Sequence, residues 1–142
     1  MNQKLVMFYN YQISKLKKLY PIIKCQIFNS DEICIIVHEY FINKITLFLK
    51  LNMLYQFKIL TCITCVDYPK NKHRFKLIYE FLSLKHNIRL KIKIFTNELI
   101  PVNSITDHFF AAKWQEAEIW DMFGIFFNKH PNLIRLLTDY GF

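Results

Sequence analysis

The stretch Trp114–Phe142, WQEAEIWDMFGIFFNKHPNLIRLLTDYGF, contains both glycines and both tryptophans of the chain. Gly124 follows the run EIWDMF, and a glycine there is typical of a left-handed helix cap, a conformation that costs other residues about 1 kcal/mol. Gly141 follows TDY in the same way. Pro131 is typical of a first helical position, because its missing N–H has no helical partner. We therefore predict two helical runs here, EIWDMF and NLIRLL, as a C-terminal helical extension.

Carboxylates interrupt the aromatic surface of the first helical run. At about 100° per residue, Glu118 and Asp121 lie within about 60° of each other. Glu116 lies on the far side, between Trp120 and Phe123. A helix that is apolar all round is typical of a buried element, and an unpaired buried charge costs several kcal/mol. Because the chain has few arginines, we predict that some partners of these acids lie on another subunit.

The same acids could instead be catalytic, because carboxylates three residues apart on a helix can hold a metal or share a proton. His108 and His130 are the nearest imidazoles, and neither fits a zinc spacing such as HExxH. No serine or cysteine lies in a nucleophile motif, and two glycines cannot form a glycine-rich phosphate loop. We interpret the acids as structural and expect no catalytic, cofactor-binding or metal-binding residue in this chain.

The stretch resembles the 30 kDa subunit family of respiratory complex I, the proton-pumping NADH:ubiquinone oxidoreductase. That family carries E-R-E-x-W-D-M-F-G, a spacer, and H-P-x-L-R-R-x-L-T-D-Y-G-F. The matching residues are Glu116, Glu118, Trp120, Asp121, Met122, Phe123 and Gly124, then His130, Pro131, Leu133, Arg135, Leu137, Thr138, Asp139, Tyr140, Gly141 and Phe142. Ala117 and Ile134 stand where the family usually has arginine, so the contacts of those two guanidinium groups are not expected here.

The resemblance implies a non-catalytic hydrophilic core subunit in the peripheral arm of complex I, scaffolding the quinone-reducing module. The expected partner is the hydrogenase-like large subunit. FMN, iron–sulfur clusters and ubiquinone would belong to the holoenzyme, and this chain would bind none of them. The candidate subunit-interface residues are Glu116, Glu118, Trp120, Asp121, Phe123, Gly124, His130, Pro131, Arg135, Asp139, Tyr140 and Gly141. The family continues with a tail E-G-H-P-L-R-K-D-F-P, which is either dispensable in this lineage or supplied by another polypeptide, and we hypothesise the second.

The charge of +8 suggests a second class of function, an organellar nucleic-acid-binding or ribosomal protein. However, sixteen of the nineteen basic residues are lysines, scattered along the chain, and alanines are few. This indicates coding bias in an AT-rich genome such as that of an organelle. We therefore expect no nucleic-acid partner. The expected location is the mitochondrial inner membrane on the matrix side, reached only through the complex, and the expected coding site is the organelle.

The predicted fold class is α+β, a mostly antiparallel sheet of four to five strands with helices packed on one face. The predicted strands span residues 22–28, 33–39, 57–66, 74–82 and 88–95. Strict alternation makes the last two an antiparallel hairpin with one core face and one cationic face. The continuous apolar run at 33–39 is typical of a central strand. No run of 18 or more uncharged apolar residues exists, so no transmembrane helix is predicted.

Three helices complete the predicted single domain of residues 1–142, with the sheet and one helix in 22–95. The first spans residues 3–20, within an N-terminal segment 1–20; it could pack on the domain or lie on a membrane surface. The second spans 42–55 and covers one face of the sheet. The third spans 105–123, either as one helix or with a break, within a signature segment 104–142. Ser104 is its predicted N-cap, with Asp107 three residues on.

Two further motifs allow both a structural and a functional reading. Cys62 and Cys65 form a CxxC, but residues three apart on a strand point to opposite faces. We interpret them as buried small residues rather than a metal or redox site. Asp67-Tyr68-Pro69 begins a basic stretch that runs to Arg74. It is either a solvated loop or a contact loop for a partner. Cys25 and Cys34 are not expected to form disulfides, because the N-terminus has no signal peptide.

Overall fold

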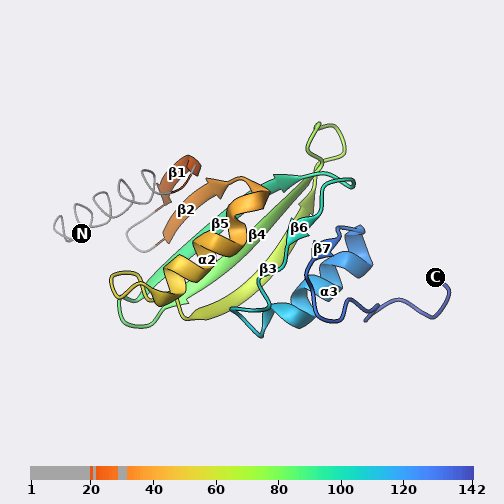
Figure 1. Cartoon of the computed structure of the whole chain (residues 1–142). Helices are drawn as coiled ribbons and strands as arrows, with labels where there is room; N and C mark the ends of the chain where they lie inside the picture. The colour runs from red at the N-terminus through yellow and green to blue at the C-terminus, as the bar shows by residue number, and fades with distance from the viewer. Residues whose placement is uncertain (1–19, 21, 29–31) are drawn as a thin grey trace.

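Five strands form one twisted sheet in the computed structural model of the chain, which describes residues 20, 22–28 and 32–142 (Figure 1). The strands are β1 (Ile22–Phe28), β2 (Glu32–Val37), β3 (Ile59–Asp67), β4 (Phe75–Ser83) and β5 (Ile88–Thr96), in the order β1-β2-β5-β4-β3. All five predicted strands are confirmed, and each end lies within two residues of its predicted position. The predicted N-terminal helix over residues 3–20 lies outside the described residues.

The sheet is mixed, because one of its pairings is parallel. β3, β4 and β5 form an antiparallel meander, and β1 pairs with β2 antiparallel. β2 pairs with β5 in parallel, so Ile35 lies beside Ile92. β2 is therefore an interior strand, as its apolar run predicts. The crossover from β2 to the meander runs through a 3₁₀ turn, η1 (Glu39–Phe41), and the helix α2 (Ile42–Leu51).

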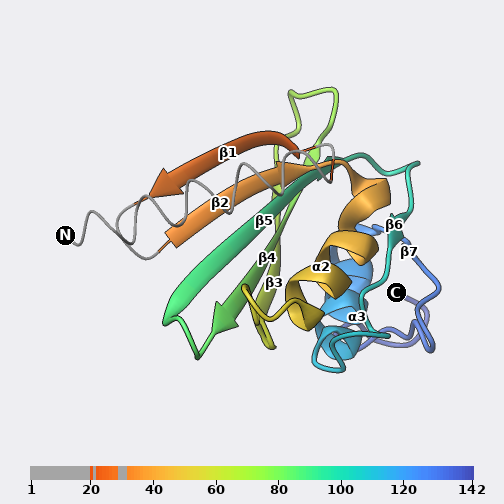
Figure 2. The ribbon, with the colours of Figure 1, turned by 60° about the vertical axis from the view of Figure 1, so that its left-hand side comes forward.

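Both helices cover the same face of the sheet, so the hydrophobic core lies on one side (Figure 2). α2 buries Ile42, Ile45 and Leu49. It ends four residues before the prediction, where the N–H of Asn52 donates to the carbonyl of Phe48 at 2.9 Å. On β4 and β5 the core-facing side chains are Phe75, Leu77, Tyr79 and Phe81 with Ile88, Leu90, Ile92 and Ile94, all buried. The predicted core face of the hairpin is confirmed.

The second helix, α3 (Ala112–Phe123), packs against β3. It begins seven residues later than predicted, because residues 105–111 form turns. Two strands of two residues each, β6 (Val102–Asn103) and β7 (Phe127–Asn128), lie on either side of α3 in the sequence and pair in parallel. They carry no period-two pattern and were not predicted. Their pairing brings the two ends of the α3 segment together.

No helix follows α3, so the predicted second helical run, NLIRLL, is wrong. Residues 129–142 form turns, bends and extended backbone, and none of residues 128–142 is buried. The core ends at Phe127, which is 1% exposed. The C-terminal helical extension is therefore one helix, α3, followed by a non-helical segment on the surface. Neither helix of the described part has the length and apolarity that a membrane crossing needs.

Candidate functional site

Asp121, near the end of α3, accepts four hydrogen bonds from the non-helical segment. Its Oδ2 accepts the backbone N–H groups of Leu136, Leu137 and Thr138 at 3.1, 2.8 and 3.1 Å. Its Oδ1 accepts the Thr138 hydroxyl at 2.6 Å. The Thr138 hydroxyl is the largest cause, followed by the Leu137 N–H, of the lowering of the pKa of Asp121 to about 2. These N–H groups are directed to a side chain, which explains why NLIRLL is not a helix.

Glu116 lies on the buried side of α3 and is fully excluded from solvent. Ser104 donates its hydroxyl to Oε2 at 2.6 Å, and the N–H of Ile105 donates to Oε1 at 2.9 Å. Burial raises the pKa of Glu116 to about 7, although the two hydrogen bonds lower it. The predicted N-cap role of Ser104 is therefore wrong. Ser104 instead joins the turn before α3 to the carboxylate one turn inside the helix.

The partners of these two acids lie in this chain, so the prediction that another subunit supplies some of the partners remains a prediction for Glu118 alone. Backbone N–H groups and hydroxyls satisfy Glu116 and Asp121 without any arginine. Glu118 is exposed, and it makes no hydrogen bond or ion pair with the residues that the structure describes. The prediction that α3 is buried all round is also wrong, because Trp114 and Met122 are more than half exposed. Only Glu118 is left for a partner outside the chain.

Gly124 ends α3 in the left-handed conformation, as predicted. Its φ is 74° and its N–H donates to the carbonyl of Trp120 at 2.9 Å. Phe123, the last helical residue, contacts Phe75 of β4 edge-to-face with ring centroids 6.1 Å apart. These contacts fix the end of α3 against the sheet. The chain then turns into β7 with Ile125 and Phe127 in the core.

His130 joins the segment after β7 to the start of α3. Its Nδ1 accepts the N–H of Asn132 at 3.2 Å, so Nε2 carries the proton and donates to the carbonyl of Lys113 at 3.1 Å. Pro131 is exposed and begins a bend rather than a helix. Lys113 was not singled out in the sequence, because a backbone carbonyl gives no sequence signal.

Arg135 shapes the last residues of the chain. Its guanidinium donates to the carbonyl of Phe142 at 2.8 Å. Its Cζ lies 6.0 Å from the centroid of the Trp120 ring. The carbonyl of Asp139 accepts the N–H of Phe142 at 3.1 Å. Gly141, with φ of 82°, supplies the left-handed residue of this turn. The structure thus brings eight of the twelve predicted interface residues into one bonded group around α3, while Glu118, Pro131, Tyr140 and Gly141 make no hydrogen bond or ring contact within the described residues.

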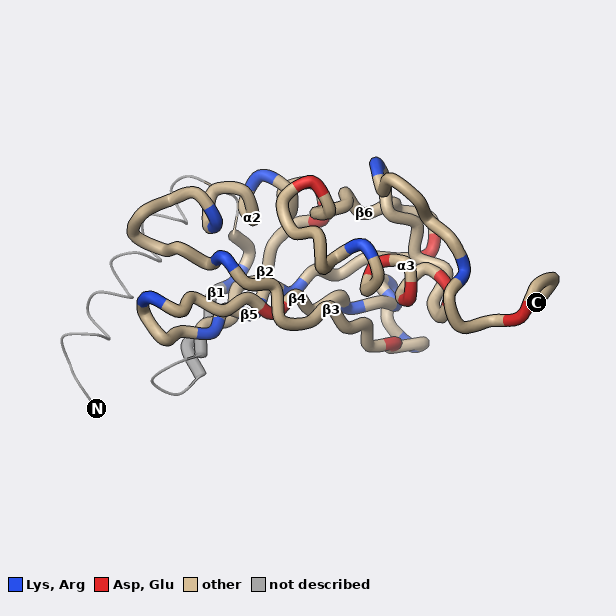
Figure 3. The backbone as a smooth tube through the Cα atoms, turned by 90° about the horizontal axis from the view of Figure 1, so that it is seen from below, with Lys and Arg blue, Asp and Glu red and all other residues tan. Residues whose placement is uncertain are grey.

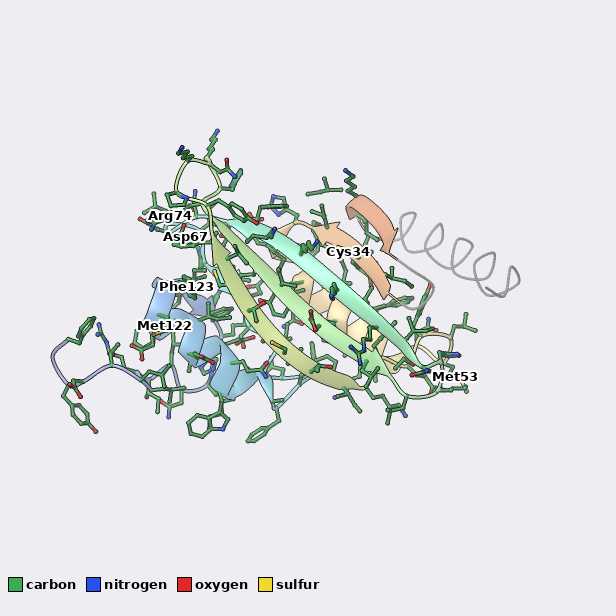
Figure 4. All side chains as sticks on the ribbon, turned by 180° about the vertical axis from the view of Figure 1, so that it is seen from behind. Cys34, Met53, Asp67, Arg74, Met122 and Phe123 are labelled. Carbon is green, nitrogen blue, oxygen red and sulfur yellow. The ribbon has the colours of Figure 1, made fainter. Side chains whose placement is uncertain are left out.

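Exposed apolar side chains surround this bonded group. They are Trp114, Met122, Phe126, Ile134, Leu137, Tyr140 and Phe142, each at least 45% exposed. We call them the signature surface. Met122 lies on α3, next to Phe123, at the opposite end of the molecule from Met53 (Figure 4). Exposed apolar groups that gather in one region are typical of protein interaction sites.

The cysteines of the described part do not suggest a redox or metal site. Cys34, Cys62 and Cys65 are free thiols. Burial raises the pKa of Cys65 to about 12 and is the main cause that raises that of Cys62, and the thiolate is the form that binds metals. Within the described residues, no three His, Cys, Asp or Glu side chains are grouped so as to hold a metal.

The positive charges are spread along the molecule rather than gathered into one stripe (Figure 3). A continuous basic face is the usual footprint of a nucleic-acid-binding protein. On the outer face of the sheet, Lys91 lies 3.5 Å from Glu80. The described part therefore offers no continuous track for a nucleic-acid backbone.

Comparison with known proteins identifies the family. The profile described as "Respiratory-chain NADH dehydrogenase, 30 Kd subunit" matches residues 35–142. The mitochondrial "NADH dehydrogenase [ubiquinone] iron-sulfur protein 3" of Candida albicans is 47% identical over 112 residues, which cover 79% of this chain. "NADH-ubiquinone oxidoreductase subunit 9" of Prototheca wickerhamii is 37% identical over 133 residues, which cover 94% of this chain and 69% of that protein. The chain spans only 40% of the length of the Candida relative.

A solved structure has the same fold. It is titled "Nqo5 of the trypsin-resistant fragment (1-134)", and its TM-score with this chain is 0.72 at 23% identity. The alignment covers 89% of this chain and 99% of that one. The profile match includes the whole bonded group around α3. The chain therefore belongs to the 30 kDa subunit family of respiratory-chain NADH dehydrogenase.

Proposed function

We propose that the chain is a non-catalytic, hydrophilic core subunit in the peripheral arm of proton-pumping NADH:ubiquinone oxidoreductase. Its partners are other subunits of that complex, chiefly the hydrogenase-like large subunit of the quinone-reducing module. The observation that carries the proposal is a difference between the polar and the apolar residues of the family signature. Two of its acids, Glu116 and Asp121, are hydrogen-bonded inside the chain, whereas the seven apolar side chains of the signature surface are exposed.

The signature surface is the proposed docking face. Tyr140 is fully exposed and Phe142 is 84% exposed, yet the turn that carries them is held by Arg135 and Asp121. A large aromatic side chain on a pre-ordered turn loses little conformational freedom when a partner covers it. Aromatic anchors are also the residues that dominate protein interfaces. This surface thus has the properties of a site for a permanent partner.

We further propose that the chain holds no cofactor and no active site of its own. Two acids of the signature, Glu116 and Asp121, are bound by structural hydrogen bonds, and burial raises the pKa of the Cys62 and Cys65 thiols. The name of the Candida relative includes "iron-sulfur protein". In our proposal the clusters, FMN and ubiquinone are held elsewhere in the complex.

The proposed location is the matrix side of the mitochondrial inner membrane, reached through the complex. The Candida relative carries "mitochondrial" in its name, and the lysine-rich, alanine-poor composition is consistent with an organelle genome. The coding site is tested directly by hybridisation of the coding sequence to purified organelle DNA.

Native gel electrophoresis of solubilised mitochondria tests the function. An antibody against the chain should detect a band that also reduces a tetrazolium dye in the presence of NADH. Depleting the chain should remove that band and leave other respiratory complexes in place. Sedimentation of the chain with ribosomes, and not with NADH dehydrogenase activity, would contradict the proposal and favour the nucleic-acid-binding alternative.

A further inference from the structure

A second surface, remote in sequence from α3, has the properties of a docking site. The hairpin between β3 and β4 bends over the ends of β2 and β5 and forms one wall of a cavity of about 440 Å³. Its other walls come from β1, from the start of η1 and from β5. A cavity of this size is in the range of about 300–1,000 Å³ that binding clefts occupy. No residue of the signature surface lines it.

The hairpin is held rigidly at its base. Arg74 donates from Nε and one terminal nitrogen to both carboxylate oxygens of Asp67, each at 2.7 Å, and from the other nitrogen to Glu98 at 2.6 Å. The N–H of Tyr68 donates to the carbonyl of Arg74 at 2.8 Å. Figure 4 shows Asp67 and Arg74 together where the loop leaves the sheet. These bonds fix the base of the hairpin and so set the position of its tip beside the cavity.

The tip carries two lysines that no acid of the described residues neutralises. Lys70, Lys72 and His73 are exposed, and neither lysine makes an ion pair with a residue in the described part of the chain. The acids nearby are already engaged, since Asp67 and Glu98 bond to Arg74. Across the cavity, Nδ1 of His38 lies 3.3 Å from Glu39. An incoming carboxylate would therefore meet unpaired positive charge at Lys72.

The floor of the cavity is apolar. Val37 is buried beneath it, Phe95 is 36% exposed and Ile23 is 67% exposed. A nucleic-acid backbone prefers a longer track of cations than Lys70 and Lys72 provide, and Glu39 on the opposite wall lies 3.3 Å from Nδ1 of His38. An acidic peptide segment with an apolar side chain beside its carboxylate fits both walls.

We propose that this cavity, the hairpin pocket, binds an acidic segment of a second subunit, with a carboxylate at Lys72 and an apolar side chain against Phe95. This inference rests on the proposed function, because the partner is a member of the same complex. It adds a contact face that the family signature does not include.

Lysine footprinting on the intact complex tests the proposal. N-hydroxysuccinimide acetate acetylates accessible amines, and mass spectrometry gives the rate at each lysine relative to the denatured complex. Lys72 should react at least tenfold more slowly than Lys85, which is exposed in the turn between β4 and β5. A zero-length carbodiimide should join Lys72 to an aspartate or glutamate of another subunit. Equal rates at the two lysines would overturn the proposal.

Charge reversal supplies an independent readout. Lys72→Glu should shift release of the chain from the complex to lower salt and weaken its retention about tenfold, equivalent to about 1.4 kcal/mol, because it sets like charges against each other in the interface. Lys85→Glu is the matched control. If Lys72→Glu and Lys85→Glu behave alike, the proposal fails. If protection of Lys72 disappears after ribonuclease or lipid extraction, the partner is not a protein segment and the proposal also fails. A wild-type chain that never migrates with the complex would instead refute the proposed function.

Discussion

At the scale of single residues, two acids of one helix have pKa values moved in opposite directions. Glu116 lies in the core with two donors, and burial outweighs them, so its pKa is raised to about 7. Asp121 lies nearer the surface with four donors, and its pKa is lowered to about 2. The number of donors and the depth of burial decide the sign in each case. Glu116 therefore responds to pH near neutrality, whereas Asp121 stays ionised at all pH values above about 4.

Glu116 should make the stability of the chain depend on pH. Its pKa in the folded state, about 7, lies above its ordinary value of 4.5, so folding favours the protonated acid. Its contribution is complete below pH 4.5 and is lost as pH rises through 7, on the order of 3 kcal/mol in total. Glu116→Gln removes this dependence. Urea unfolding at pH 5 and pH 8 should show a smaller loss of stability in Glu116→Gln than in wild type.

Glu118→Gln is the matched control for that experiment, because Glu118 is exposed on the same helix. Its pH dependence should equal that of wild type. An equal loss of stability in wild type and Glu116→Gln would show that the carboxylate is solvated in solution.

Asp121→Asn should release the C-terminal segment. The amide keeps the shape of the carboxylate but loses its charge and one acceptor oxygen. Three N–H groups and the Thr138 hydroxyl then compete for the one oxygen that remains. Amide hydrogen exchange at Leu136, Leu137 and Thr138 should become faster, with little change in β4 or β5. Because the pKa of Asp121 is lowered, the wild-type contacts are complete above pH 3.8 and are lost as pH falls through about 2.

The same charge change at Asp139, in Asp139→Asn, serves as the comparison. Asp139 is exposed, and its backbone carbonyl rather than its carboxylate makes the turn to Phe142. Exchange at residues 136–138 should be unaffected by it. Faster exchange in both variants would mean that net charge, and not the Asp121 contacts, holds the segment.

At the scale of elements, long-range contacts set the limits of α3. Its start is displaced to Ala112 because residues 104 and 105 turn back to bond Glu116. Its end is set locally, by the left-handed glycine that the sequence predicts. The helix therefore has one boundary that the local sequence encodes and one that depends on the tertiary structure.

Gly124→Ala should destabilise the fold by about 1 kcal/mol, because a side chain is disfavoured at its φ of 74°. A Cβ at this position meets nothing within 4 Å, so the cost is conformational and not steric. Urea unfolding measures it. Gly141→Ala is the matched control, with φ of 82° and similar free space. It should scarcely change global stability, because the residues around it are exposed. Equal losses in both would refute a specific capping role.

The elements with a local signal could be predicted from the sequence, and those fixed by distant contacts could not. Alternation in β4 and β5 follows from having one face in the core, and Gly124 follows from its backbone conformation. The run NLIRLL has helical composition. However, N–H groups of this run donate to the carboxylate of Asp121, which lies at least fifteen residues away in the sequence. The parallel pairing of β2 with β5 has no local signal. The bonding of Glu116 to Ser104 likewise needed the tertiary structure.

At the scale of the whole molecule, the core and the proposed interfaces are separate. Helices α2 and α3 cover one face of the sheet, and the last buried residue is Phe127 (Figure 2). The C-terminal segment beyond it is held by polar contacts to α3. Changes at its exposed residues should therefore affect assembly without affecting the fold.

The double variant Tyr140→Ser and Phe142→Ser tests this separation. Both side chains are exposed, so the midpoint of thermal unfolding of the chain should move by no more than about 2 °C. The fraction of the chain that migrates with NADH dehydrogenase activity should fall, because aromatic anchors contribute most to interfaces. Native gels and quantitative immunoblots give both quantities.

Met53→Ser is the control for apolar area, since Met53 is 78% exposed at the opposite end of the molecule. It should leave the assembled fraction unchanged. Normal assembly of the double variant would remove the signature surface from the proposed interface.

The parallel pairing of β2 with β5 has a consequence for the order of folding. Ile35 and Ile92 are more than fifty positions apart, whereas the β3–β4–β5 meander closes through short turns. Distant pairings form slowly, because a long loop must close first. During synthesis on a ribosome, β2 emerges well before β5 and has an unpaired edge until residue 96 has left the exit tunnel. Pulse-labelling of refolding chains should show that the amides of the meander are protected before those of β2. The β1–β2 pair, which is synthesised first, is the part that a chaperone would need to shield.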